Sequence, residues 1–201
     1  MTVGQRFARL ATNVVVRWPR FWPLFRPLVR GQFDRLAPVW DQMRMEDTFA
    51  SYEAALQRID ASVERALDVG TGTGAGARLL KQRYPGADVV GVDLATGMLD
   101  EARRLVPGVS FVAGDAARLP FGDDSFDLVA HQNMIPFVNQ VDRVLKPGGW
   151  VLFAFSAGPE TPIWVEPERL RRELERRGFT DFAEIAAGRG IAVVARAPDA
   201  N

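Results

Sequence analysis

The stretch that decides the fold is Ala66-Leu67-Asp68-Val69-Gly70-Thr71-Gly72-Thr73-Gly74, followed directly by Ala75-Gly76-Ala77-Arg78-Leu79-Leu80. A short apolar run ends in three glycines at every second position, and a helical pattern begins at once. This order predicts a strand, a tight turn and the start of a helix. Glycine adopts positive φ and has no Cβ, so a ligand can lie directly on this backbone. The free N–H groups of the helix start would suit a carboxylate or a hydroxyl.

Two kinds of nucleotide site compete for this loop. Gly70-x-Gly72-x-x-Ala75 satisfies the dinucleotide fingerprint G-x-G-x-x-G/A loosely. Residues 68–74 resemble, at every position, the E/D-x-G-x-G-x-G loop of class I S-adenosylmethionine-dependent methyltransferases. Charge favours the second site, because Asp68 would repel a pyrophosphate but would attract the ammonium and sulfonium groups of S-adenosylmethionine to an acidic rim. The alternative is a glycine-rich turn that binds no ligand. Such a turn does not account for three glycines at alternate positions directly after an acidic residue.

Composition narrows the classes of function. The 201 residues suffice for one domain with a sizeable core, and 25 basic and 25 acidic side chains give no overall argument for nucleic-acid binding. The chain has no cysteine and one histidine, so we expect no disulfide, thiol nucleophile or metal site. Neither a signal peptide nor an apolar run long enough to span a bilayer is visible, so the expected location is the cytoplasm.

Residues 1–62 are expected to form a helical N-terminal arm and lid. The first 44 residues hold eight arginines against two aspartates, a local charge of +6, and the rest of the chain carries −6. Residues 5–16 predict a short helix, whereas three prolines between residues 17 and 30 argue against any long helix there. Two interpretations of the alternating aromatic and arginine side chains stay open. They pack onto the core, or residues 14–30 contact a membrane surface or an apolar substrate.

A second resemblance lies at residues 33–45, Phe33-Asp34-Arg35-Leu36-Ala37-Pro38-Val39-Trp40-Asp41-Gln42-Met43-Arg44-Met45. They resemble the F-D-x-x-A-x-x-Y-D entry segment of quinone-biosynthesis methyltransferases, with Trp40 at the tyrosine position. The resemblance implies a lid over the cofactor. Residues 46–60 predict an amphipathic helix with Phe49, Tyr52, Leu56 and Ile59 on one stripe. Phe33, Trp40 and Tyr52 are therefore the candidate lid or substrate residues.

The cofactor-binding core is expected to span residues 63–198. Residues 75–83 and 96–105 predict helices, and residues 87–92 and 109–113 predict strands. Asp93 lies 23 positions after Gly70, the spacing typical of a carboxylate that binds the ribose hydroxyls. A role as a helix cap is the alternative for Asp93, but Thr96 is better placed for it.

Further strings resemble the methyltransferase superfamily in the same order along the chain. Residues 96–104 resemble its S-x-x-M-L-x-x-A-R helix, residues 114–121 its G-D-A-x-x-L-P-F string, and residues 123–129 and 145–149 its D-x-S-F-D-x-V and L-K-P-G-G strings. In the family the aspartate of G-D-A accepts a hydrogen bond from the adenine amino group, and the next N–H reaches the ring. The resemblance implies these cofactor-binding residues: Asp68, Gly70, Thr71, Gly72, Gly74, Asp93, Leu94, Met98, Asp115, Ala116 and His131.

The implied fold class is α/β, a doubly wound, seven-stranded, mostly parallel Rossmann-like sheet with a helical N-terminal arm. Residues 166–177 predict a helix, and residues 179–187 and 191–197 predict the antiparallel pair that completes the sheet. Residues 131–145 are short for the two helical pieces that the family usually has there. We therefore expect the arm to close the substrate side.

The candidate catalytic residue is His131, which leaves the fourth strand beside the expected methyl position. Two roles for His131 are weighted equally. It acts as a general base, or it forms a hydrogen bond to the backbone or contacts the cofactor. Asn133 is a candidate substrate-side residue. The string at residues 133–137, Asn-Met-Ile-Pro-Phe, does not match the N-P-P-Y/F signature of base and amide methylators, which disfavours nucleic-acid targets.

The resemblance implies an S-adenosylmethionine-dependent methyltransferase that acts by in-line transfer on a small, largely apolar molecule. Two functions of other classes stay open. One is a protein that binds S-adenosylmethionine or a membrane without catalysis. The other is an aminopropyltransferase, which would need an acidic cluster that residues 131–137 do not supply.

Overall fold

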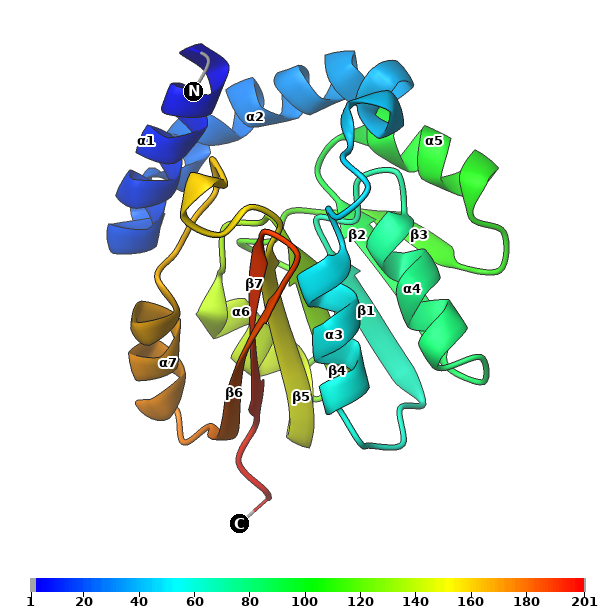
Figure 1. Ribbon diagram of the computed structural model, residues 1–201, viewed down its shortest axis with the longest axis vertical. Coiled ribbons are helices and arrows are strands. Elements are labelled where there is room, and N and C mark those ends of the chain that lie inside the picture. Colours follow the sequence, from blue (N-terminus) through cyan, green and yellow to red (C-terminus); the bar gives the residue numbers. More distant parts are fainter. Residues whose placement is uncertain (1–2, 201) are drawn as a thin grey trace.

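The computed structural model describes residues 3–200 and contains a seven-stranded sheet, helices on its faces and a helical arm along one edge (Figure 1). The strands are β1 (Arg65–Val69), β2 (Asp88–Asp93), β3 (Ser110–Ala113), β4 (Phe126–Gln132), β5 (Leu145–Phe155), β6 (Thr180–Ala187) and β7 (Gly190–Arg196). The helices are α1 (Val3–Arg17), α2 (Trp22–Leu36), α3 (Ala50–Arg58), α4 (Ala75–Arg83), α5 (Thr96–Leu105), α6 (Val138–Val144) and α7 (Pro167–Glu175). Short 3-10 helices are η1 (Pro19–Phe21), η2 (Ala37–Met43) and η3 (Gly158–Glu160).

The strand order is β3-β2-β1-β4-β5-β7-β6, and this confirms the predicted fold class. Strands β1 to β5 are parallel, and β7 runs antiparallel to both of its neighbours. The register sets Val69 of β1 beside Val92 of β2 and His131 of β4. The carboxyl ends of the parallel strands therefore meet at one edge, which is where open α/β sheets bind ligands.

Both faces of the sheet are buried, so its central strands are apolar runs rather than alternating ones. Val129 of β4 packs in a cluster with Val141 of α6 and Leu170 of α7. Its neighbour Leu128 packs in a second cluster, which contains Tyr52 of α3 and Leu80 of α4. The two clusters lie on opposite faces because successive side chains of a strand alternate.

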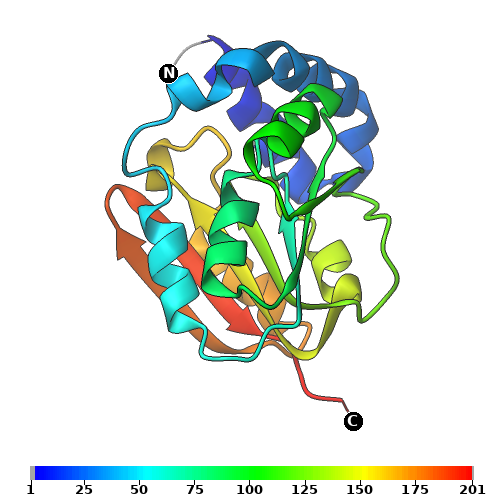
Figure 2. The same cartoon turned by 90° about the vertical axis from the view of Figure 1, so that its right-hand side faces the viewer.

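The arm (residues 3–45) lies along the carboxyl edge of the sheet, as the two views agree (Figures 1 and 2). The expectation that prolines exclude a long helix within residues 17–30 is wrong, because α2 has 15 residues. Pro23 sits in its first turn, where the missing N–H would have no partner in any case. Pro27 is inside the helix and removes one intrahelical hydrogen bond, while its fixed φ remains compatible with helical backbone.

One helix boundary differs from the sequence-based prediction, and one strand begins inside a family string. Helix α3 begins at Ala50 rather than near residue 46. Strand β5 begins at Leu145, before the Lys-Pro-Gly-Gly string, and pairs Leu145 with Phe126. A bulge then leads to the pairing of Trp150 with Leu128. Gly148, at φ 72°, permits this irregular backbone.

Within residues 3–200, none of the helices combines the length and apolar character that spanning a bilayer requires.

Candidate functional site

The glycine loop between β1 and α4 is held against the end of β2. The backbone N–H groups of Gly70 and Thr71 donate to the carbonyl of Val92, at 2.8 and 3.0 Å. Gly70, Gly72 and Gly74 have φ of 70°, 54° and 85°, a region that side chains with a Cβ disfavour. This conformation explains why the loop needs three glycines.

The three glycines face different surroundings. A Cβ on Gly70 would overlap Met134 and lie 2.6 Å from its Sδ, and one on Gly72 would lie 3.7 Å from Nε1 of Trp40. A Cβ on Gly74 would instead lie 3.0 Å from the side chains of Phe111 and Val106. Gly70 thus presents bare backbone toward Met134 and Gly72 toward Trp40 of the arm, whereas Gly74 packs against Phe111 and Val106.

Asp68 lies beneath the loop and not on its rim. Its Oδ2 accepts a 2.6 Å hydrogen bond from the Thr71 hydroxyl, and the residue is only 2% exposed. Burial raises the pKa of this carboxyl to about 6. The expected acidic rim is therefore a correction: Asp68 orders the loop from inside, because its strand position points into the layer under α4.

Asp93 links the glycine loop to the start of α5. Its Oδ2 accepts the N–H of Gly72 at 2.8 Å, and its Oδ1 accepts the N–H of Ala95 at 2.9 Å. The backbone N–H of Leu94 also favours the charged form of this carboxyl, so several backbone donors hold it in place. Burial raises the pKa of this carboxyl. Beside it, Leu94 is half-buried and Met98 is buried against the arm.

Asp115 follows β3 and is contacted by the arm. Its Oδ1 accepts the Ala117 N–H at 2.9 Å and the indole N–H of Trp22 at 2.8 Å. Its Oδ2 has only a 3.4 Å contact with the guanidinium of Arg26. One oxygen is therefore used twice, and the other is weakly held. The adjacent Ala116 is buried in the main core cluster.

His131 is buried on β4, and its ring stacks on Phe153 with the centroids 4.8 Å apart. Neither ring nitrogen has a hydrogen-bond partner in the described part of the chain. Burial lowers the pKa of this imidazole to about 3, so it is neutral at physiological pH. A base of this pKa is weak near pH 7, while two unsatisfied buried nitrogens suit a polar ligand group.

The segment from Phe33 to Met43 lies over the glycine loop and the start of α5. Thr73 Oγ1 donates to Asp41 at 2.6 Å, and the N–H of Gly97 donates to Asp34 at 2.8 Å. Phe33 and Trp40 pack edge to face with the ring centroids 5.3 Å apart. The two candidate aromatic residues therefore lie in a cover over the loop.

Two candidate substrate residues have other positions than expected. Tyr52 is fully buried between α3 and the sheet, so its assignment to a lid is wrong. Its place on an apolar stripe reflects core packing. Asn133, at φ 53°, uses both ends of its amide on Ser156 at 2.9 Å and so joins the ends of β4 and β5. That structural role leaves its substrate contact a prediction.

Sequence reasoning missed five residues of this region. They are Trp22 and Arg26 on Asp115, Asp34 and Asp41 of the cover, which accept hydrogen bonds from the core, and Met134 on the glycine loop. The two aspartates were visible in the F-D-x-x-A-x-x-Y-D string as acidic positions. No sequence signal indicated which residue Trp22 or Met134 would contact, because both contacts are tertiary.

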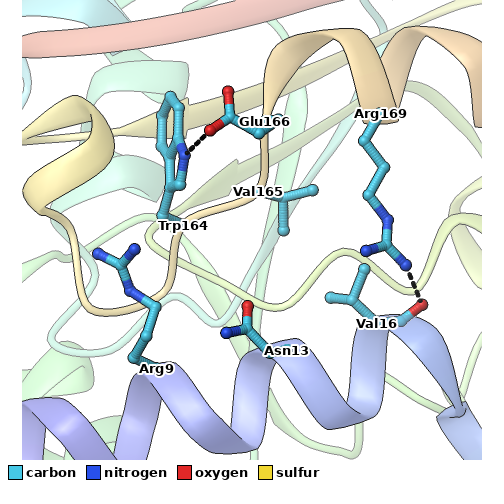
Figure 3. Close-up of a pocket in the computed structure, with 7 residues that line it drawn as sticks. All are labelled: Arg9, Asn13, Val16, Trp164, Val165, Glu166 and Arg169. Carbon is cyan, nitrogen blue, oxygen red and sulfur yellow. Dashed lines mark hydrogen bonds between the residues drawn. The ribbon is translucent and has the colours of Figure 1, made fainter.

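A cavity of about 230 Å³ lies elsewhere, between α1 and the loop before α7 (Figure 3). Arg9 donates to the carbonyls of Pro159 and Thr161 at 2.6 Å, and Arg169 donates to that of Val16 at 3.0 Å. These bonds fix α1 to the segment that follows β5. The arm is thus anchored both there and at Asp115. Among the described residues, no group of three or more His, Cys, Asp or Glu side chains could hold a metal ion.

Comparisons with known proteins agree with this architecture. Residues 67–153 match the sequence model of a family described as "Methyltransferase domain". A relative from Beutenbergia cavernae, named demethylmenaquinone methyltransferase, is 44% identical over 108 residues, which are 50% of this chain and 44% of the relative. The chain spans between 43% and 66% of the length of five such relatives.

Solved structures show the same fold. A methyltransferase bound to the Trm112 activator of Haloferax volcanii aligns with a TM-score of 0.70 at 22% identity, over 83% of this chain and 97% of that one. Phosphoethanolamine N-methyltransferase 2 of Haemonchus contortus, solved with S-adenosyl-L-methionine, aligns with a TM-score of 0.61 at 24% identity, over 76% of this chain and 43% of that one.

Proposed function

The chain carries a methyltransferase domain, and from this premise we propose that it uses S-adenosylmethionine to methylate a small, largely apolar molecule. The observation that carries the proposal is the edge at which the glycine loop, Asp93 and Asp115 meet. This edge combines bare backbone with carboxylates that backbone N–H groups hold in place.

The residues fit the cofactor in three places. The bare backbone at Gly70 and Gly72 would face its methionine part once the Met134 side chain moves aside, because neither glycine adds a Cβ there. The Asp93 carboxylate, an acceptor fixed between the glycine loop and the start of α5, suits the ribose hydroxyls. The weakly held Oδ2 of Asp115 suits the adenine amino group, once the exposed Arg26 side chain moves aside.

The cover over the loop is proposed to act as the lid. Residues 33–45 lie on the glycine loop through Asp41 and on α5 through Asp34. Met134 occupies the space over Gly70, and an unbranched thioether side chain repacks readily. Cofactor entry would therefore displace Met134 and lift the lid, which closes again over the ligand and keeps water out.

The chemistry follows from this enclosure. When bound, S-adenosylmethionine supplies a methyl group on a sulfonium, ready for in-line displacement. The chain aligns the acceptor and excludes water. His131 stays neutral near pH 7 and is too weak a base to take the acceptor's proton, so we assign it a binding role. The acceptor must then present an ionised or intrinsically nucleophilic atom.

An apolar acceptor is supported by the side chains around His131. Phe153 stacks on its ring, and Ile135 and Phe137, which come next along the chain, are buried in the main core cluster together with Phe153. The relative from Beutenbergia cavernae is named for an aromatic, lipid-like acceptor, which agrees with such a lining. We propose that the protein works in the cytoplasm and takes an acceptor of this chemical kind.

The test is transfer of a labelled methyl group from S-adenosylmethionine to a panel of hydroquinones and fatty acids. We expect label in the organic extract, and a loss of transfer in Asp93→Asn. Asp88→Asn, at the opposite end of β2, is the matched control and should stay active. Binding without transfer to any acceptor would favour the non-catalytic alternative, and an absence of binding would refute the proposal.

A further inference from the structure

The exposed apolar surface of the molecule is concentrated on the arm. Among the described residues, eight large hydrophobic side chains are at least 38% exposed, and seven of them lie between residues 10 and 45. Leu24 and Leu28 of α2 are 69% and 60% exposed, and Trp18 is 45% exposed. A concentration of this kind marks an interaction surface rather than scattered surface residues.

Helical geometry places these leucines on the outer side of the arm. On α2, Trp22, Phe25 and Val29 pack into the core at positions i, i+3 and i+7. Leu24 and Leu28, four residues apart, lie on the opposite side. On α1, Leu10 is exposed, whereas Ala11 and Val15 are buried. Figures 1 and 2 show the arm on the outside of the molecule, beyond the sheet edge.

Exposed basic side chains lie on the same helices and connections as these leucines. Arg6, Arg17, Arg20 and Arg35 are exposed, and none of them forms an ion pair with a described residue. The two acidic residues of the first 44, Asp34 and Asp41, bond to the core at Gly97 and Thr73. We call Leu10, Trp18, Leu24 and Leu28 with these four arginines the outer face of the arm.

We propose that the outer face docks on a membrane surface that contains anionic lipids. Leucines that project from a helix would enter the boundary between headgroups and acyl chains, and the arginines would contact phosphate groups. Trp18, whose ring lies 5.2 Å from the Arg17 guanidinium carbon, is the side chain that prefers the interface between them. Projecting leucines distinguish this surface from a nucleic-acid site, which would gain nothing from them.

Docking in this orientation sets the lid next to the lipid, since residues 33–45 continue directly from α2. The inference itself does not rest on the proposed function, because no residue of the outer face is proposed to contact the cofactor, and only Arg35 is shared with the lid segment. Membrane binding is therefore measurable without cofactor or acceptor.

The test is sedimentation of the full chain with vesicles of phosphatidylcholine, with and without a third of phosphatidylglycerol. We expect binding to the anionic vesicles and its loss at high salt. The double variant Leu24→Gln/Leu28→Gln should bind about tenfold more weakly. Arg17→Gln/Arg20→Gln should bind several-fold more weakly and lose about half of the salt dependence, because Arg6 and Arg35 remain.

Matched controls lie outside the arm. Leu105→Gln replaces an exposed leucine of α5, and Arg104→Gln/Arg176→Gln replaces two exposed arginines. Both should bind as the wild type does, and circular dichroism verifies that every variant is folded. Equal losses in controls and arm variants would overturn the proposal. A wild type that binds neither kind of vesicle would also overturn it. The outer face would instead be a dimer interface if ultracentrifugation showed a wild-type dimer that Leu24→Gln/Leu28→Gln dissociates and the wild type did not bind vesicles.

Discussion

Replacing His131 with phenylalanine should change how the stability of the protein depends on pH. The His131 ring is buried against Phe153, and burial lowers the pKa of the imidazole from 6.5 to about 3. Phenylalanine keeps the stacked ring and removes both nitrogens. Because the chain has a single histidine, every histidine-linked effect on stability belongs to this residue.

Whether stability rises or falls with pH depends on which state, native or unfolded, binds the histidine proton more tightly. The unfolded chain protonates its histidine as the pH falls through 6.5, while the native ring stays neutral down to about 3. The contribution of the neutral ring to stability is therefore present above 6.5 and is lost progressively below it. Between pH 7.5 and pH 5 the loss is about 2 kcal/mol.

Asp68 acts in the opposite direction. Its native pKa of about 6 exceeds the ordinary aspartate pKa of 3.8, so the native state takes up this proton first and gains stability as the pH falls from 7.5 to 5. The gain is about 1 kcal/mol and partly hides the effect of His131 in the wild type. Asp68 is present in both the wild type and His131→Phe. Its contribution therefore cancels when the changes in unfolding free energy of the two proteins are subtracted.

The assay is urea unfolding of both proteins at pH 7.5 and pH 5, followed by circular dichroism. We expect the free energy of unfolding of the wild type to fall by about 2 kcal/mol more than that of His131→Phe over this interval. Equal changes in the two proteins would refute the reasoning. The native imidazole would then titrate as an ordinary histidine, and a role as general base would regain support.

Three further predictions concern the loop and the arm. Thr71→Val removes the donor to Asp68 and should cost about 1.5–3 kcal/mol of unfolding free energy at pH 7.5, with a smaller cost at pH 5 where that carboxyl is protonated; equal costs at the two pH values would contradict it. Gly70→Ala introduces a Cβ at φ 70° that overlaps Met134, so S-adenosylmethionine binding in calorimetry should weaken by about tenfold or more, while Gly86→Ala, which has open space, should bind normally. Trp22→Phe keeps the ring contact with Phe137 but removes the N–H donor to Asp115, so urea unfolding should show a loss of about 1.5–3 kcal/mol, and an unchanged midpoint would mean that this bond contributes nothing.

The core could be predicted from the sequence because its signals are local. Helices α4 and α5 have the predicted bounds. Apolar periodicity indicates both helices, and the glycines before α4 also indicate where that helix begins. The spacing from Gly70 to Asp93 predicted a carboxylate beside the loop, and the bond from Gly72 to Asp93 agrees with that position.

What the sequence did not determine depends on tertiary contacts. The stripe through Tyr52 predicted a buried helix side correctly, but the pattern is the same for a lid and for a core helix. Proline at 27 argued against α2, whereas packing of Trp22, Phe25 and Val29 outweighs one missing hydrogen bond. The acidic position 68 could not reveal whether its carboxylate faces a ligand or the interior.

The central claim is that S-adenosylmethionine binds along this edge with its ribose on Asp93, and isothermal titration of the full chain tests it most directly. Asp93→Asn is compared with Asp88→Asn, which changes an exposed carboxylate at the other end of the same strand. We predict that the wild type and Asp88→Asn bind with the same dissociation constant. Asp93→Asn should bind about 30-fold more weakly, the loss of about 2 kcal/mol from hydrogen bonds to a charged acceptor. Equal affinities of all three folded proteins would contradict the assignment of this edge as the cofactor site.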